Sequence, residues 1–198
     1  MSPGKTQWKL FILLLSVQVA LVVFLLAVQP ASDPLSGIVR AAGVIGYFCS
    51  FLAIASSAFK KKIAKMTGKP FLGIHHLFAV TAISMMLMHV GALLLITGDP
   101  SMLLPHFASL EGFFVLGGRL ALPMFLVAGI TARFAGSIKY WKALHLLNYT
   151  AFFLGTTHAI MIGQDFQWTS MKVAAIVLCA ATLGIFATKH ILRNRKAA

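Results

Sequence analysis

The sequence predicts an all-α polytopic membrane protein built as a six-helix transmembrane bundle. Hydrophobic residues make up 59% of the 198-residue chain and charged residues only 11%, and the mean hydropathy is +0.89. This composition is too apolar for a soluble domain. Six segments approach the length of about 20 apolar residues that a helix needs to cross a bilayer. We therefore expect one transmembrane domain over residues 1–198, with helices near 10–28, 36–59, 71–97, 112–133, 143–163 and 171–189.

The first apolar segment is predicted to be a retained helix and not a cleaved signal peptide. Its apolar run from Leu10 to Val28 is longer than the hydrophobic region of a typical signal sequence. The sequence Gln29-Pro30-Ala31-Ser32 that follows offers no convincing small-x-small cleavage site. The later connectors are short and contain neither a glycine-rich phosphate loop nor a Cys-x-x-Cys motif. We expect no soluble catalytic domain between the helices.

Charged residues in the connectors predict the topology of the six segments. Basic residues precede the first segment, fill the second-to-third and fourth-to-fifth connectors, and follow the sixth; these positions hold fourteen of the 17 lysines and arginines. The acidic residues all fall on the opposite side, at Asp33, Asp99, Glu111 and Asp165. The positive-inside rule then places both termini in the cytoplasm, with the chain crossing the inner (plasma) membrane several times. Lipid, and not nucleic acid, is the expected partner of the net charge of +13.

Four histidines lie in the third and fifth segments, at nearly the same spacing. His75 and His89 are fourteen residues apart, and His145 and His158 are thirteen apart. Ionisable groups inside a membrane are costly and usually functional. The two segments run in the same direction, so His75 and His145 share the inner depth and His89 and His158 the outer depth. At about 1.5 Å per residue, the two depths are about 20 Å apart.

Pairs of imidazoles on facing helices of a bundle are typical haem-iron ligands. The prediction is one haem between His75 and His145 and a second between His89 and His158. Two histidines leave no open position on the iron, which favours electron transfer over ligand chemistry. No Cys-x-x-Cys-His motif is present, which excludes covalent attachment and leaves two b-type haems.

Helical periodicity supports the first histidine pair better than the second. Fourteen residues at about 100° per residue return to within about 40° of the starting face, so His75 and His89 can share a face. Thirteen residues place His145 and His158 about 140° apart on a straight helix. Either a local distortion around Gly155 to Thr157 or a rotated haem plane would be needed.

Two arginines lie deeper than the positive-inside rule explains. Arg40 is about one turn, and Arg119 about two turns, inside the outer ends of the second and fourth segments. Both are predicted to contact the propionates of the outer haem or an anionic acceptor; snorkelling to the outer surface is the alternative. On the inner side, the propionate or donor-docking candidates are Lys69, Lys139 and Lys142.

At these residues the chain resembles the ferric reductase-like transmembrane domain family. That family includes haem-binding subunits of bacterial methionine sulfoxide reductases, yeast-type ferric reductases and the membrane core of NADPH oxidases. The resemblance rests on the stretch from Gly73 to Val90, on Trp141-x-x-x-His145-x-x-x-Tyr149 with His158, and on Gly163-Gln-Asp165. It covers roughly residues 36–189. It implies two b haems held by the third and fifth helices and electron flow from a flavin-bearing donor inside to an acceptor outside.

The expected function is that of a transmembrane b-type di-haem cytochrome, an oxidoreductase component without a flavin or NADPH domain of its own. The electron donor would be a separate flavin-bearing or quinol partner on the cytoplasmic side. The acceptor would be ferric iron, oxygen or a periplasmic redox protein. One alternative is a quinol-linked haem subunit that anchors a larger oxidoreductase, such as a methionine sulfoxide reductase system. Another is a haem-free transporter or scaffold with proton-relay histidines, which would favour intramembrane carboxylates that the sequence lacks.

Overall fold

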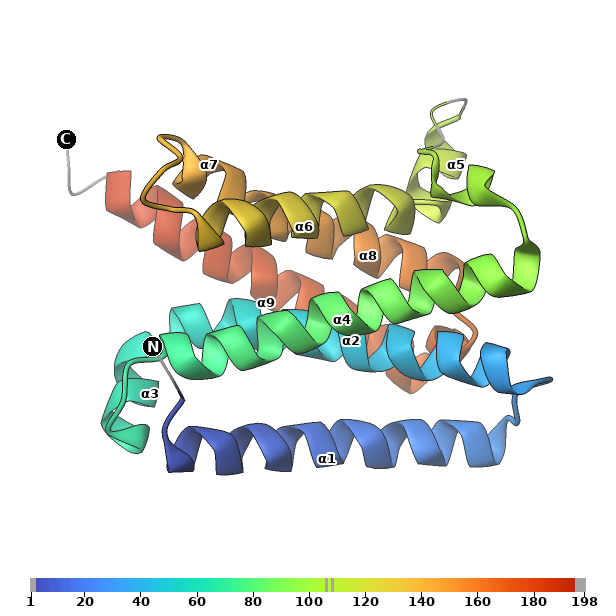
Figure 1. The fold of residues 1–198 in the computed structure, drawn as a ribbon, viewed down its shortest axis with the longest axis horizontal. Coiled ribbons are helices and arrows are strands. Elements are labelled where there is room, and N and C mark those ends of the chain that lie inside the picture. Colours follow the sequence, from blue (N-terminus) through green and yellow to red (C-terminus); the bar gives the residue numbers. More distant parts are fainter. Residues whose placement is uncertain (1–2, 106, 108, 195–198) are drawn as a thin grey trace.

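The protein is a bundle of helices that run roughly along its long axis (Figure 1). The structure, a computed structural model, describes residues 3–105, 107 and 109–194, with side chains described as far as residue 189. Within these ranges every regular element is a helix, and there is no strand. The all-α prediction is therefore confirmed.

Four helices are long and apolar enough to cross a membrane. They match the predicted segments near 10–28, 36–59, 71–97 and 171–189, and they are α1 (Lys5–Val28), α2 (Pro34–Ala58), α4 (Leu72–Thr97) and α9 (Thr169–Asn194). A short basic helix, α3 (Lys60–Thr67), joins α2 to α4. Asp33 caps α2, since its carboxylate accepts from the backbone N–H of Ser36 at 3.0 Å. Gly68 and Gly98, in the left-handed conformation, end α3 and α4.

The other two predicted segments are each divided into two helices. Residues 112–133 fall in α5 (Leu110–Val115) and α6 (Gly118–Arg133), and residues 143–163 fall in α7 (Trp141–His145) and α8 (Leu147–Ile162). α6 and α8 have 16 residues each, or about 24 Å at about 1.5 Å per residue. A hydrocarbon core is about 30 Å thick. Four of the six predicted spanning helices are therefore confirmed as long and apolar enough to cross a membrane, and the six-helix arrangement stays a prediction. The short 3-10 turns η1 (Pro100–Leu103) and η2 (Asp165–Gln167) complete the described elements.

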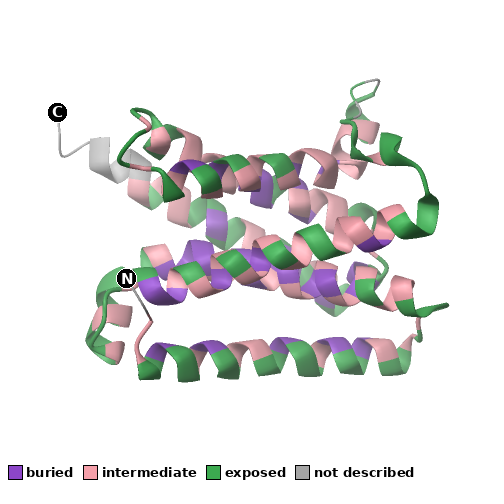
Figure 2. Cartoon of the chain, viewed as in Figure 1, coloured by how far each residue is buried: buried purple, intermediate pink, exposed green. Residues whose placement is uncertain are grey.

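α2 is the central helix of the bundle. It packs along most of the length of α4 on one side, and it also contacts α1, α8 and α9. α1 buries only the face that carries Phe11, Gln18, Val22 and Leu25 and exposes apolar side chains on its other face (Figure 2). An apolar outer surface is what a lipid environment permits. α8 packs against α6 and α9, and the ring of its Phe152 stacks on Tyr47 of α2 at a centroid distance of 5.0 Å.

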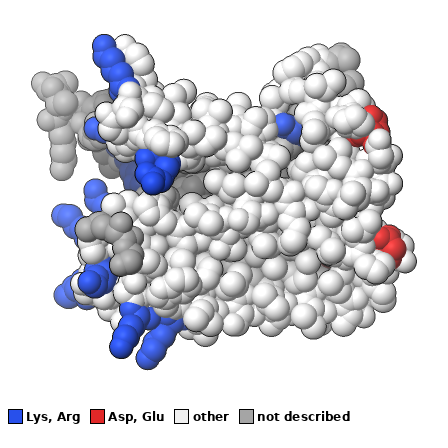
Figure 3. Space-filling view, in the orientation of Figure 1, with Lys and Arg blue, Asp and Glu red and all other residues white. Residues whose placement is uncertain are grey.

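The two ends of the bundle carry opposite charge. Lysine and arginine side chains gather at the end where α3 and α7 lie, and acidic side chains appear at the other end (Figure 3). The basic side chains beyond residue 189 lie outside the described part of the chain. This distribution agrees with the charge pattern of the connectors, and the assignment of the basic end to the cytoplasm stays a prediction.

Candidate functional site

The structure brings His75 and His145 together near the basic end of the bundle. His75 lies in the first turn of α4 and His145 is the last residue of α7. Their ring centroids are 6.3 Å apart and both residues are half-buried. The adjacent His76 is exposed, which agrees with its position on another face of α4.

His89 and His158 form a second pair farther from the basic end. His89 lies on α4 fourteen residues beyond His75, and His158 lies near the end of α8. Both side chains are half-buried. The two rings are close enough to interact electrostatically. The four histidines therefore fall into the two pairs that topology predicts.

All four histidines use Nδ1 in the same way. In each of them this nitrogen donates to a backbone carbonyl of a neighbouring helix. Such a bond fixes the tautomer, so that Nε2 carries the lone pair. In His145 the side-chain amide of Asn148 lies 3.4 Å from this Nε2, and a metal ligated there would take the place of that contact. The acceptors for His75, His89, His145 and His158 are the carbonyls of Ala53 (2.9 Å), Val39 (2.8 Å), Ala128 (3.1 Å) and Val115 (2.8 Å).

The acceptor carbonyls repeat the spacing of the histidines. Val39 and Ala53 on α2 are fourteen residues apart, as are the two histidines of α4. Val115 and Ala128 on α5 and α6 are thirteen residues apart, as are the histidines of α7 and α8. Each histidine helix is thus paired with an antiparallel acceptor helix in a constant register. This arrangement orients two rings at two depths in each half of the bundle.

A helix break lies within the thirteen-residue spacing between His145 and His158. The backbone N–H of Leu146 donates to Ala143 at 3.0 Å, and that of Tyr149 donates to Leu146 at 3.0 Å, which are three-residue bonds between α7 and α8. The tighter turn changes the rotational phase of the helix between the two histidines. α8 continues unbroken through Gly155 to Thr157. The distortion expected at those residues is therefore at Leu146 instead.

A second break supplies the acceptor for His158. Val115 is the last residue of α5, and the N–H that would bond its carbonyl in a regular helix, that of Arg119, instead donates to Leu116 at 2.9 Å. The freed Val115 carbonyl accepts from His158. A Cβ at Gly118 would lie 2.9 Å from the His158 ring. Glycine is thus needed where this ring approaches α6.

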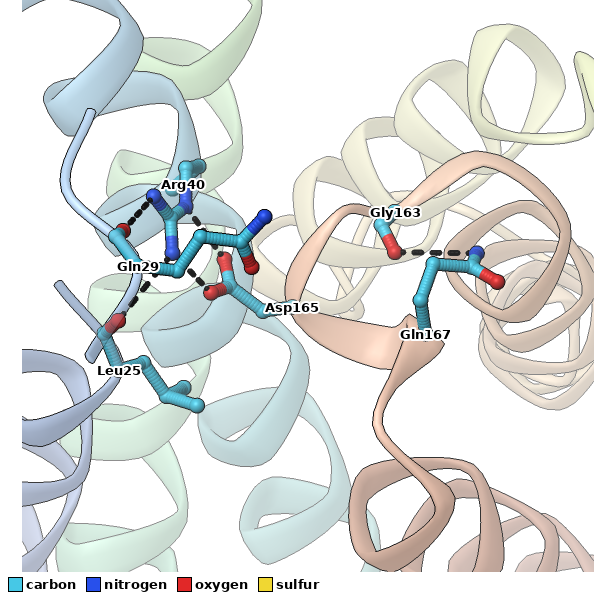
Figure 4. Close-up of polar contacts among 6 residues, drawn as sticks. All are labelled: Leu25, Gln29, Arg40, Gly163, Asp165 and Gln167. Atoms are coloured by element: carbon cyan, nitrogen blue, oxygen red, sulfur yellow. Dashed lines mark hydrogen bonds and ion pairs between the residues drawn. The ribbon is translucent and has the colours of Figure 1, made fainter. Parts of the chain in front are cut away.

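The predicted propionate partner Arg40 has other partners in the structure. Its guanidinium binds both carboxylate oxygens of Asp165, with Nη2 2.6 Å from Oδ1 and Nε 3.1 Å from Oδ2 (Figure 4). It also donates to the carbonyls of Gln29 and Leu25 at the end of α1. Arg40 and Asp165 are 8% and 4% exposed. These contacts give Arg40 a structural role that joins α1, α2 and η2.

Arg119 lies beside the outer pair. It interacts electrostatically with His158, and its Nη1 donates to the carbonyl of Leu104 at 3.0 Å. The side chain is partly exposed. Arg119 also interacts electrostatically with Asp99. Its contact with a propionate or another anion beside His89 and His158 stays a prediction.

Lys189 is a cation beside the inner pair that sequence reasoning assigned only to topology. It is half-buried at the end of α9, donates to the hydroxyl of Ser57 and interacts electrostatically with His75. The hydroxyl of Ser56 lies 3.2 Å from His75 Nδ1. By contrast, Lys69, Lys139 and Lys142 are exposed. Only the contact between α2 and α9, which the sequence pattern does not specify, reveals the role of Lys189.

The ring planes of the inner pair make an angle of 64°, and the distance between their centroids can be compared with that of two imidazoles on one metal. A metal–imidazole bond of about 2 Å, with the ring centre about 1 Å behind the nitrogen, places two opposed rings with centres about 6 Å apart. The observed separation is 6.3 Å. Among the described residues, α4 and α8 have almost no close backbone contact with each other. In the same part of the chain, no group of three or more His, Cys, Asp or Glu side chains could hold a metal ion. Two-histidine ligation of a haem iron requires only a pair.

Comparisons of the chain with protein-family models, with curated proteins and with solved structures find no significant match.

Proposed function

We propose that this chain is a transmembrane b-type cytochrome with two haems, one held by His75 and His145 and the other by His89 and His158. The supporting observation is the set of four Nδ1–carbonyl hydrogen bonds in matched register. A histidine that only filled the core would need a partner, but four unrelated histidines would not all bond a backbone carbonyl through the same ring nitrogen. The proposal extends to a six-helix topology in which α5–α6 and α7–α8 cross the membrane as broken helices. Such breaks are tolerated where protein or a cofactor covers them.

The residues of the chain would perform three tasks at each pair. The carbonyl bond to Nδ1 fixes the ring plane and makes Nε2 more basic. The neighbouring cation, Lys189 inside and Arg119 outside, offsets negative charge brought by propionates. The apolar helices keep water away from the rings. When bound, haem b supplies a one-electron iron couple.

The proposed direction of electron flow is from the basic end to the acidic end of the bundle. The donor would be a flavin-bearing or quinol partner in the cytoplasm, where the exposed Lys139 and Lys142 offer a docking charge. The acceptor would be ferric iron, oxygen or a redox protein on the outer side.

Visible spectroscopy of the purified protein tests the proposal. The oxidised and dithionite-reduced spectra, with a pyridine haemochrome assay, should show two b haems per chain. The variants His75→Ala and His89→Ala should each lose one haem, from the inner and outer pair respectively. The matched control is His76→Ala, which removes an exposed histidine from the same helix and should retain both haems.

Three outcomes would contradict the proposal. Wild-type protein that is folded, supplied with haem and still colourless would exclude a cytochrome. One haem per chain would exclude two centres. Equal haem loss in His76→Ala and His89→Ala would show that haem content reports general folding and not ligation.

A further inference from the structure

A basic groove lies at the end of the bundle where α3 turns into α4. It has a volume of about 490 Å³, is open to the outside and is lined by Lys60, Lys61 and Lys69 together with Pro70 and Phe71. All three lysines are exposed. None of the four paired histidines lines the groove, although the ring of Phe71 lies 6.0 Å from that of His75, centroid to centroid.

The wall of the groove is held in place by α1. Gln7 is fully buried, and its side-chain amide donates to the carbonyl of Pro70 at 2.9 Å, with longer contacts to the carbonyl of Lys69 and the hydroxyl of Thr67. Gly68 in the left-handed conformation turns the chain directly before these residues. On the other wall, Ile63 of α3 packs against the core between α1, α2 and α4. The backbone that carries the three lysines is therefore held in place by buried contacts.

No acidic side chain compensates the charge of this groove. The four acidic residues lie at the start of α2, directly after α4, in α5 and in η2, at the end of the bundle opposite to α3 (Figure 1). Among the described residues, the one ion pair is between Arg40 and Asp165. Three ammonium groups around one groove therefore repel one another until an external anion binds.

Exposed apolar side chains lie next in sequence to residues that line the groove. Phe59, Met66 and Leu72 adjoin the lysines in sequence and are 57%, 64% and 37% exposed. The neighbouring α2 and α4 are helices long and apolar enough to cross a membrane, and they end here. Lysines next to exposed apolar side chains, at the end of helices that can cross a membrane, match the two parts of a phospholipid, its charged headgroup and its acyl chains.

We propose that this groove is a binding site for the headgroup of an anionic phospholipid in the leaflet at the basic end of the bundle. Phosphate oxygens would accept from Lys60, Lys61 and Lys69, and the acyl chains would lie along Phe59 and Leu72. A soluble phosphate would gain the ammonium contacts but not the apolar ones. The bound lipid would fix α3 against the membrane surface.

Native mass spectrometry of the full-length protein in neutral detergent tests this site with phosphatidylglycerol as the probe and phosphatidylcholine as the neutral reference. The test variant is the triple substitution Lys60→Gln, Lys61→Gln and Lys69→Gln. The matched control is Lys62→Gln, Lys65→Gln and Lys139→Gln, which removes the same charge from the same end without touching the groove. The test variant should bind the first phosphatidylglycerol at least about tenfold more weakly than wild type, and the control should bind it within about twofold.

Equal weakening in the two triple variants would overturn the proposal, because general charge attraction would then explain the binding. Unchanged affinity in the test variant would overturn it as well. Glycerol phosphate that displaced the lipid at equal concentration would identify a soluble-anion site instead. If the triple variant does not fold, Lys61→Gln compared with Lys62→Gln applies the same criterion one charge at a time.

Discussion

The buried ion pair between Arg40 and Asp165 gives a quantitative test of how α1, α2 and η2 are held together. The perturbation is Arg40→Met, which leaves the Asp165 carboxylate 4% exposed and without another hydrogen-bond partner among the described residues. Breaking a buried pair from one side typically costs about 3–5 kcal/mol. Asp165→Asn should cost less, about 2 kcal/mol, since the guanidinium keeps the carbonyls of Gln29 and Leu25.

The assay is thermal unfolding of the purified variants in one detergent. For a chain of this size, a loss of about 4 kcal/mol lowers Tm by roughly 10 °C, so the two single variants should be distinguishable. The double variant Arg40→Met with Asp165→Leu removes both charges and should be more stable than Arg40→Met alone. Additive losses in the double variant would refute the ion pair, and an undisturbed Arg40→Met variant would refute its burial.

Three further predictions concern single side chains. Gly118→Ala would place a Cβ 2.9 Å from the outer histidine ring it faces and should reduce haem content in a haemochrome assay, whereas Gly184→Ala, in open space, should not; equal contents would contradict the close approach. Gln7→Ala removes the buried amide that holds the loop before α4 and should lower the free energy of unfolding by about 1–3 kcal/mol; a thermal melt identical to wild type would show that other contacts hold the loop. Hydrogen bonds from the Ser36 side chain and backbone lower the pKa of Asp33 from 3.8 to about 2. Because the folded-state pKa is depressed, the stabilising contribution of Asp33 is fully present above about pH 4 and is lost as the pH falls towards 2; acid-unfolding curves of Asp33→Ala should lack this slope, and curves parallel to wild type would refute it.

Features that depend on long apolar runs and on charge could be predicted from the sequence. The apolar lengths predicted α1, α2, α4 and α9 to within a few residues, because a bilayer sets the helix length. The alternation of basic and acidic connectors predicted which histidines lie at equal depth. Apolar length and connector charge depend on whether lipid or water surrounds a segment. They can therefore be interpreted without knowing which helices contact each other.

Features that depend on contacts between distant residues could not be predicted. Arg40 and Asp165 are 125 positions apart, and no periodicity joins a residue of α2 to the η2 turn. No proline or glycine lies at the break at Leu146, so the local sequence does not predict a break at this position. Gly155, where the distortion was expected, lies inside the unbroken helix α8. In the sequence, Lys189 is one of the basic residues that only indicate topology. Its hydrogen bond to Ser57 depends on the packing of α9 against α2, which the sequence pattern does not specify.

The two halves of the bundle reach one arrangement by different backbone routes. In the α2–α4 pair, a fourteen-residue spacing keeps both histidines on one face of an unbroken helix, and regular helix carbonyls accept from both Nδ1 atoms. In the other half, a thirteen-residue spacing would turn His145 and His158 apart, and both the histidine helix and its acceptor helix are broken, at Leu146 and at Leu116–Gly117. If the histidines served only to pack helices, an unbroken helix with a different residue would be cheaper, since each break forgoes regular backbone bonds. That both breaks fall where they restore the Nδ1–carbonyl bond argues that ring orientation is the feature the fold preserves.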